Sequence, residues 1–293
     1  MIQLGIGAIC ISFAPIFVKL IDLSPTLIGF YRCFFAAVLL LPWIIFRGLK
    51  KKEDSSFLYS SNQKKLFLFL SGASLFFAMD LFVWHRSVVY AGAGVGTILA
   101  NTQVFYLSLF GFIFLKERPK PRFWLGVVLG FFGLFFLIQF YQKDWVGERF
   151  HEGVMFGLIT GIAYASFILT LRFAERGREA VETTQKLFHL SLMTSLVLIP
   201  IVLTEGPWQW PEGNDWFWVL GLAALPQALG WVLITKGLAK VSAGMGGLIL
   251  LLQPVLATGM GSLFFNERLT YIQLLGAILT LFGIFLGSHR ASK

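Results

Sequence analysis

The chain has 293 residues, of which 57% are hydrophobic and 13% are charged, with a formal net charge of +9. The mean hydropathy of +0.76 excludes an ordinary soluble domain and indicates an integral membrane protein. In a soluble chain the excess of Lys and Arg would suggest nucleic acid as a partner. No DNA- or RNA-binding motif accompanies it, and membrane orientation explains it instead.

Ten apolar stretches have the length that a helix needs to cross a bilayer, about 20 residues. We place these predicted spans at 3–22, 26–46, 65–87, 91–115, 121–141, 152–174, 184–204, 215–238, 244–265 and 271–288. Turn-forming Pro and Gly residues separate several of them, at 22–25, 118–121 and 206–213. The sequence therefore predicts an all-α integral membrane protein with ten transmembrane helices.

Residues 91–137 reappear at a fixed offset of 150 positions. The match repeats small residues and one charged pair: Ala93, Gly94, Gly96, Gln103, Gly111, Phe114, Glu117, Arg118, Gly126 and Gly133 fall on Ala243, Gly244, Gly246, Gln253, Gly261, Phe264, Glu267, Arg268, Gly276 and Gly283. Because such residues set helix packing and helix ends, the match indicates a duplicated membrane unit. We expect a single transport domain, 1–293, built of two repeats, 1–142 and 151–293. Each repeat holds five spans, an odd number, so the two are inverted.

The basic residues predict the orientation. Ten spans assign 18 of the 24 Lys and Arg residues to the side that holds both termini and five to the other side, with Arg32 inside the second span. By the positive-inside rule, both termini are cytoplasmic. We therefore expect a multi-pass protein of the cell (inner) membrane.

Several short motifs carry a resemblance to a known family: FYR at 30–32, LKERP at 115–119, LLQP at 251–254 and FNERLT at 265–270. With the glycine-bearing spans that follow, over essentially the whole chain, they resemble an EamA-type, ten-helix member of the drug/metabolite transporter superfamily. The resemblance implies a carrier that exports or exchanges small metabolites by alternating access. Val104 stands where the second repeat has Pro254, so we expect a broken helix in the second repeat only.

Arg32 and Asp80 lie inside predicted spans at similar depths, about 10–12 Å from the outer helix ends. A charge in hydrocarbon needs a partner or a polar cavity. Two interpretations stay open. The residues form a structural ion pair between the second and third spans, or one or both of them contact a charged substrate. Proton exchange at Asp80 is a variant of the second interpretation.

Three further side chains are candidates for the same site. Trp84 follows Asp80 by one helical turn, so it either lines a cavity or anchors the helix at the membrane interface. His85 points about a third of a turn away and is a second candidate for proton coupling. Tyr164, in the sixth span, either binds the substrate or packs in a helix interface.

Gln103 and Gln253 occupy equivalent positions of the two repeats, each about 15 Å into its helix and thus near the bilayer midplane. Inverted-repeat carriers bind substrate at this depth, and an amide can both donate and accept. Asn101 lies just before Gln103, and Pro254 frees a backbone carbonyl beside Gln253. We expect both amides to border one central cavity. The alternative is that they hydrogen-bond neighbouring helices together.

Two other patterns concern packing or movement. Glu117-Arg118 and Glu267-Arg268 lie at opposite membrane faces, where we expect local ion pairs at helix ends, with gating as the alternative. The glycines at 126, 130, 133, 276 and 283 predict close packing between helices, with a homodimer as the alternative.

No metal-ligand cluster, nucleophile triad or phosphate loop occurs in the sequence, so we expect no metal, no cofactor and no enzymatic activity. The sequence favours a secondary transporter that exports a small polar metabolite, an amino acid or a related compound. The alternatives are an exporter of aromatic compounds or many drugs, and a non-transporting membrane interaction protein. Because a basic residue shares the depth of the acidic one, zwitterions or anions are favoured over cations.

Overall fold

The structure is a computed structural model that describes residues 1–50, 61–91, 99–137, 149–176, 181–265 and 270–288. Regular structure in these ranges is entirely helical. The helices are α1 (Ile2–Ser12), α2 (Ala14–Leu20), α3 (Pro25–Lys50), α4 (Ser61–Ala91), α6 (Gln103–Leu115), α7 (Pro121–Leu137), α8 (Phe150–Arg176), α9 (Thr183–Glu205), α10 (Asp215–Leu222), η2 (Ala223–Gly230), α11 (Trp231–Leu238), α12 (Ala243–Leu250), α13 (Leu252–Phe265) and α14 (Tyr271–Ser288).

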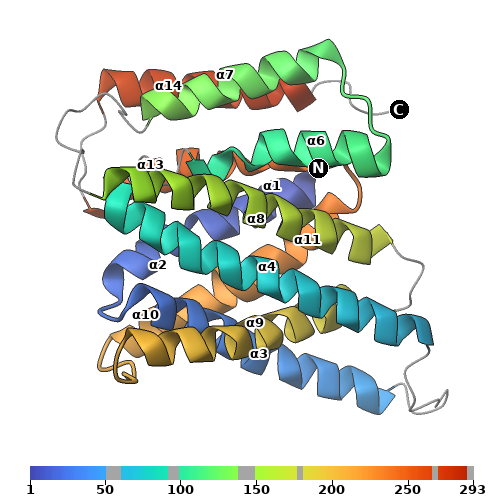
Figure 1. The fold of residues 1–293 in the computed structure, drawn as a ribbon, viewed down its shortest axis with the longest axis vertical. Coiled ribbons are helices and arrows are strands. Elements are labelled where there is room, and N and C mark those ends of the chain that lie inside the picture. The colour runs from blue at the N-terminus through green and yellow to red at the C-terminus, as the bar shows by residue number, and fades with distance from the viewer. Residues whose placement is uncertain (51–60, 92–98, 138–148, 177–180, 266–269, 289–293) are drawn as a thin grey trace.

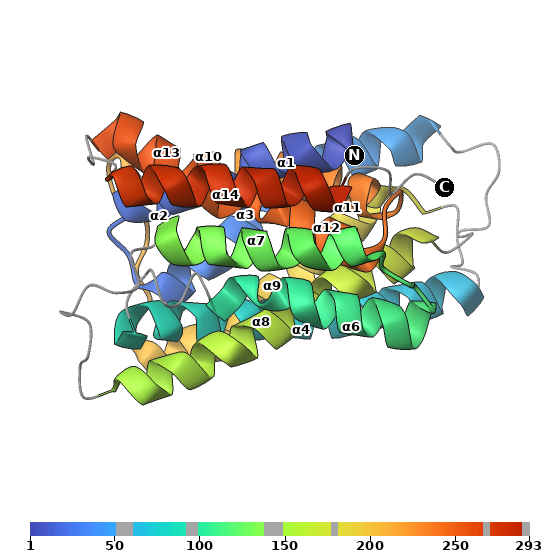
Figure 2. The same cartoon turned by 90° about the horizontal axis from the view of Figure 1, so that it is seen from above.

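The helices lie side by side and run along one common direction (Figures 1 and 2). Helix α1 begins and α14 ends at one end of the bundle, which we call the terminal end. The turns at 20–25 and 205–215 lie at the opposite end, which we call the far end (Figure 1). Among the described residues, five helices are long and apolar enough to cross a membrane: Pro25–Phe46, Leu66–Trp84, Phe150–Ala174, Thr183–Glu205 and Asp215–Leu238. Shorter apolar helices accompany them: Ile2–Val18, Leu99–Leu115, Pro121–Phe136, Ala243–Ala257 and Tyr271–Gly287.

The first predicted span, 3–22, consists of two helices, α1 and α2, which corrects the expectation of one. The backbone turns at Phe13, whose amide donates to the Cys10 carbonyl over 3.4 Å, one residue closer than in an α-helix. Pro15 explains the break, because it has no N–H to offer the Ile11 carbonyl.

The fourth and ninth predicted spans are also interrupted, at places that correspond between the two repeats to within one residue. In the first half of the chain the helix turns at Thr102, whose hydroxyl and amide donate to the Leu99 carbonyl over 2.5 and 3.1 Å. In the second half, Leu251 separates α12 from α13, and its amide donates to the Leu248 carbonyl over 3.2 Å. The expectation of a break beside Pro254 only is therefore wrong. The Thr102 hydroxyl breaks the first helix by competing for a backbone carbonyl.

The eighth predicted span, 215–238, is one rod made of α10, η2 and α11 (Figure 1). Segment η2 is π-helical and contains Pro226. In an α-helix this proline would leave the Leu222 carbonyl without a donor, whereas the i→i+5 pattern of a π-helix pairs carbonyls with later residues. The rod therefore continues through a proline that would otherwise kink it.

Helices α7 and α14 pack antiparallel, and glycines allow their close approach (Figure 1). A Cβ built on Gly126 would lie 2.6 Å from the Gly283 carbonyl oxygen, and one on Gly133 would lie 2.7 Å from the Gly276 carbonyl oxygen. No side chain fits at these distances. The glycines at these positions therefore bring the backbones of α7 and α14 into direct contact within one chain.

Candidate functional site

A cavity of about 170 Å³ lies among α1, α2, α3, α4, α8, α11, α13 and the residues just before α6. Most of its wall is apolar, as expected inside a bundle of this composition. Its polar and aromatic lining side chains are Ser12, Arg32, Phe77, Asp80, Trp84, Asn101, Thr160, Tyr164, Trp231 and Gln253. The breaks at Phe13 and Leu251 both lie beside this cavity, because Ser12, Ala14 and Gln253 flank them.

The cavity occupies the half of the bundle nearer the far end. Arg32 lies seven residues after the start of α3, and Trp84 lies seven residues before the end of α4. At 1.5 Å per residue, both are about 10 Å from the far end. A solute in this cavity is thus nearer to the far end than to the terminal end.

Arg32 and Asp80 line the cavity together, and their charges are close enough to attract each other. The Arg32 Nε donates to the Gln227 Oε1 over 3.0 Å, and its guanidinium carbon lies 6.0 Å from the Phe77 ring centroid. Sequence reasoning missed Gln227, although a polar residue after a proline in an apolar span was a signal.

Aromatic rings form the inner wall of the cavity. Trp231 is 2% exposed, and its ring centroid lies 4.9 Å from that of Phe167 and 6.2 Å from that of Tyr164. Phe77 stacks on Phe167, with ring centroids 4.4 Å apart. Trp231 was missed by sequence reasoning, because a Trp in an apolar helix reads as a packing residue. These rings separate the cavity from the terminal end of the bundle.

Of the other residues that the sequence predicts for the site, some line the cavity and some do not. Asn101 and Gln253 lie in the cavity wall, with Trp84 and Tyr164. Gln103 is 1% exposed and is not among the described residues that line the cavity. The Gln103 Oε1 and the Gln253 Nε2 have no hydrogen-bond partner among the described residues. The side chain of His85 lies outside the described part of the chain.

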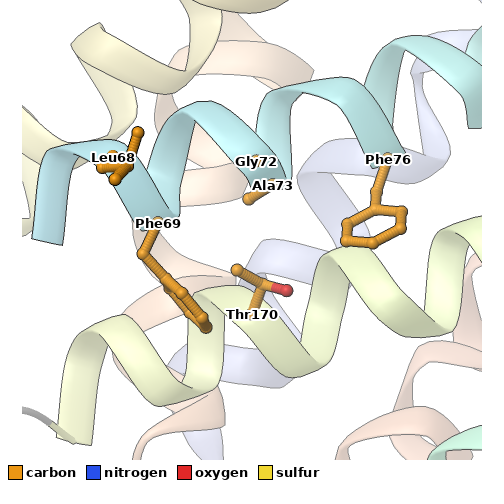
Figure 3. Close-up of a pocket in the computed structure, with 6 residues that line it drawn as sticks. All are labelled: Leu68, Phe69, Gly72, Ala73, Phe76 and Thr170. Atoms are coloured by element: carbon orange, nitrogen blue, oxygen red, sulfur yellow. The ribbon is translucent and has the colours of Figure 1, made fainter. Parts of the chain in front are cut away.

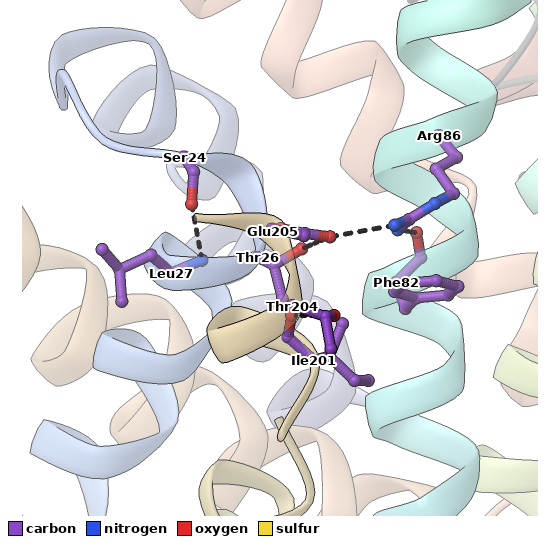
Figure 4. Close-up of polar contacts among 8 residues, drawn as sticks. All are labelled: Ser24, Thr26, Leu27, Phe82, Arg86, Ile201, Thr204 and Glu205. Carbon is purple, nitrogen blue, oxygen red and sulfur yellow. Dashed lines mark hydrogen bonds and ion pairs between the residues drawn. The ribbon is translucent and has the colours of Figure 1, made fainter. Parts of the chain in front are cut away.

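At the far end, Glu205 joins α3, α4 and α9 (Figure 4). Its Oε1 accepts hydrogen bonds from the Thr26 hydroxyl and from the Arg86 guanidinium, both over 2.9 Å. Arg86 also donates to the Phe82 carbonyl over 3.2 Å. Arg86 is thereby held away from the cavity, so Arg32 is the cation in the described part of its wall.

At the terminal end, Glu117 joins α6, α8 and α12. Lys116 ends α6 with a left-handed backbone (φ 55°), and the Glu117 amide donates to the Gly111 carbonyl over 3.0 Å, which turns the chain back. The Glu117 carboxylate then pairs with the Arg172 guanidinium at 2.6 Å and accepts from the Ala243 amide at 2.9 Å. Arg172 is 1% exposed. The carboxylate thus joins helices that are distant in sequence, beyond finishing its own helix.

Comparison with known proteins gives the family. The model of the EamA-like transporter family matches residues 1–139 and 151–288. The chain belongs to the EamA-like transporter family. The resemblance seen in the sequence motifs is thereby confirmed, and the protein is an integral membrane transporter by family and by its apolar helices.

Relatives of this EamA family member are named as transporters. One from Archaeoglobus fulgidus, named an uncharacterized transporter, is 25% identical over 281 residues, 96% of this chain and 93% of the relative. The S-adenosylmethionine uptake transporter of Rickettsia prowazekii is 22% identical over 177 residues, 60% of this chain and 54% of that protein. A crystal structure shares the fold with a TM-score of 0.79 and 16% identity, over 97% of this chain and 95% of that one.

A larger hollow, of about 350 Å³, opens on the outside of this EamA family member (Figure 3). Leu68, Phe69, Gly72, Ala73 and Phe76 of α4 and Thr170 of α8 line it. The Thr170 hydroxyl donates to the Ser166 carbonyl over 2.7 Å, so its proton is not available to a solute. Leu68 is 75% exposed, as suits a surface that faces lipid chains. The candidate transport site is therefore the smaller cavity lined by Arg32 and Asp80.

Proposed function

We propose that the protein is a secondary transporter that carries a small zwitterionic metabolite, an amino acid or a related compound, out of the cell by alternating access. The observation that carries this proposal is that Arg32 and Asp80 line one cavity. A guanidinium binds a carboxylate through paired hydrogen bonds, and a carboxylate accepts from an ammonium group. The two side chains therefore match the two charged ends of an amino acid.

Cavity size supports a small solute. Its volume of about 170 Å³ is below the roughly 300–1,000 Å³ of sites for drug-sized ligands. An exporter of aromatic compounds or many drugs is the second candidate, favoured by the rings of Tyr164 and Trp231 in the wall. A cationic drug would meet the positive charge of Arg32 there. The third candidate is a non-transporting interaction protein, whose function would not require a cavity lined by Arg32 and Asp80. We propose no enzymatic activity.

We further propose ten transmembrane helices in two inverted repeats, 1–142 and 151–293, within one transport domain. Positions 126 and 276 are equivalent in the two halves, as are 133 and 283. The contacts of Gly126 with Gly283 and of Gly133 with Gly276 therefore exchange under a two-fold rotation. Between them the Thr280 hydroxyl lies 3.4 Å from the carbonyl of Gly130, its equivalent residue. The breaks at Thr102 and Leu251, which correspond to within one residue at the offset of 150, support the same symmetry.

Orientation and partners complete the proposal. We place the terminal end in the cytoplasm and the protein in the inner membrane, on the distribution of Lys and Arg. The partners are the lipid bilayer and the small-molecule solute, with no nucleic acid. Asp80 is the candidate for exchange of a coupling proton, and His85 is a second one. A homodimer stays an alternative, although the glycines at 126, 133, 276 and 283 are used within the chain.

Counterflow in proteoliposomes tests this function. Proteoliposomes that contain the purified protein are loaded with one unlabelled solute at a time. Uptake of the labelled form of that solute from outside is then measured. The panel contains L-alanine, L-phenylalanine, S-adenosylmethionine and the cationic dye ethidium. We expect saturable counterflow of at least one amino acid and none of ethidium. Transport of ethidium alone would favour the drug exporter, and transport of no solute would favour the interaction protein.

A further inference from the structure

Three buried polar side chains follow one another along a single face of η2 and α11. Gln227, Trp231 and Thr235 are spaced four residues apart and are 1%, 2% and 0% exposed. Within the described ranges, no partner bonds the Gln227 Nε2, the Trp231 Nε1 or the Thr235 Oγ1. A buried donor without a partner lowers the stability of the folded protein. Three such donors in a row therefore indicate that they form hydrogen bonds in another conformation.

These three side chains continue from the cavity into the half of the bundle nearer the terminal end, which is closed. Gln227 bonds Arg32, and Trp231 lies in the cavity wall. Thr235 lies one turn further on. Lys240, five residues after Thr235, donates to the Gln3 side chain of α1 over 2.9 Å, which places this part of the chain at the terminal end. The row therefore leads from the cavity toward the terminal end.

Tight packing closes this half. A Cβ on Gly7 would lie 2.7 Å from the Ile234 side chain, and one on Gly237 would lie 2.7 Å from the Leu4 backbone, so α1 and α11 touch directly. The Thr194 hydroxyl, on α9 beside α11, is a fourth buried polar group without a partner among the described residues. The polar groups of this half are thus enclosed by protein rather than by water.

We propose that the face formed by Gln227, Trp231 and Thr235 is the closed half of the solute route, and that separation of Glu117 from Arg172 opens it. This inference rests on the proposed transport function. All three side chains offer a donor, so the row suits the carboxylate of a zwitterion that has left the Arg32 guanidinium. The Glu117 carboxylate holds α6, α8 and the start of α12 together, so its release frees three helices at the terminal end.

Thiol labelling tests the route without any solute. The two free cysteines are first removed, as Cys10→Ala and Cys33→Ala, and Thr235→Cys is introduced. A membrane-impermeant maleimide is applied to the terminal end in proteoliposomes of defined orientation. We expect slow labelling, which rises at least ten-fold when Glu117→Gln and Arg172→Gln are added together. The paired change leaves no lone buried charge.

Thr280→Cys is the matched control for labelling. Thr280 is also 0% exposed, but its hydroxyl donates to the Gly276 carbonyl of its own helix, α14, over 2.9 Å. Its labelling should stay slow in every background. An equal rise at both positions would indicate general loosening and overturn the inference, as would an unchanged rate at Thr235→Cys. If an amino acid is transported while that rate stays unchanged, the route is wrong and the proposed function stands.

Thr235→Val gives a second test that leaves Glu117 and Arg172 in place. Valine has nearly the same shape, and the Thr235 hydroxyl has no partner to lose among the described residues. The thermal unfolding midpoint should therefore not fall, whereas counterflow of L-alanine or L-phenylalanine, whichever is transported, should fall at least five-fold. A structural hydroxyl would give the opposite pattern, with a lower midpoint and unchanged counterflow, and would overturn the inference.

Discussion

Arg32 is the residue whose neighbours define the cavity. Its Nε donates to Gln227, it shares the cavity wall with Asp80, and its guanidinium lies near the Phe77 ring. A guanidinium has four further N–H groups beyond Nε, which can bind a carboxylate. A single charge inside a membrane protein is costly, so the groups around Arg32 stabilise its charge in the cavity wall.

Arg32→Gln should abolish amino acid transport. The change removes the charge that binds a carboxylate and leaves Asp80 without its counter-charge, so counterflow should fall at least ten-fold. Lys64→Gln removes the same charge from an exposed position on α4 and serves as the control, with transport unchanged. In a double-mutant cycle with Asp80→Asn, we expect the combined loss to be smaller than the product of the single losses. Strict additivity would show that the two charges act separately.

Leu in place of Gln253 should reduce counterflow several-fold without reducing the yield of folded protein. The Gln253 side chain lines the cavity, and its Nε2 has no partner among the described residues, so the fold loses no hydrogen bond through that atom. Gln103, the equivalent residue of the other half, is not among the described residues that line the cavity, so Gln103→Leu should reduce counterflow less than Gln253→Leu does. Gln209→Leu, at an exposed loop position, is the control. The binding role would be wrong if Gln253→Leu transported at the normal rate.

At the scale of helices, the glycine contacts between α7 and α14 restrict these positions to residues without a side chain. A Cβ on Gly283 would lie 2.6 Å from the Gly130 backbone nitrogen. Neither helix can move aside without losing contact along its length. These two helices therefore behave as one packed pair, in contrast to the helices that surround the cavity.

Gly283→Ala should lower stability. Overpacking of a tight contact costs about 1–3 kcal/mol, so the thermal unfolding midpoint should fall by several degrees. Gly72→Ala is the matched control, because a Cβ there meets nothing within 4 Å and α4 gains from the better helix former. Equal midpoints for the two variants would contradict the packing.

Sequence periodicity predicted much at this scale, and the departures have local causes. Apolar length located the helices, and the repeated glycines predicted close contacts now seen at Gly133 and Gly276. The break at Thr102 was hidden, because Thr is also common inside helices and its hydroxyl acts only once it bonds the Leu99 carbonyl. Gln227 was missed because a π-helical segment changes which residues share a face, and apolar pattern alone does not show this.

The whole molecule is asymmetric from end to end. The far half holds the cavity, whereas the terminal half is closed by aromatic rings, by contact of α1 with α11, and by the Glu117 pair. Arg86 and Glu205 join helices at the far end without entering the cavity wall. In the proposed alternating-access cycle, this arrangement is the state that is closed at the terminal end.

Site-directed labelling of whole cells checks the proposed orientation. In the background without native cysteines, Glu212→Cys, exposed at the far end, should react with an impermeant maleimide added outside. Lys64→Cys, exposed at the terminal end, should react only after the cells are permeabilised. The reverse pattern would place the termini outside and overturn the orientation inferred from the basic residues.

Because segment η2 precedes α11, the number of residues in η2 determines which α11 side chains face the cavity. Successive residues of an α-helix are about 100° apart around its axis. Deleting one residue from 223–230, such as the exposed Ala224, would remove an extra residue that the π-helical pattern accommodates, so the segment could form regular α-helical turns and the angle of α11 relative to α10 would change. The orientation of Trp231 in the cavity wall would then change, while α10 kept its contact with α2. A single insertion or deletion at this point could therefore alter substrate choice with every charged residue left in place.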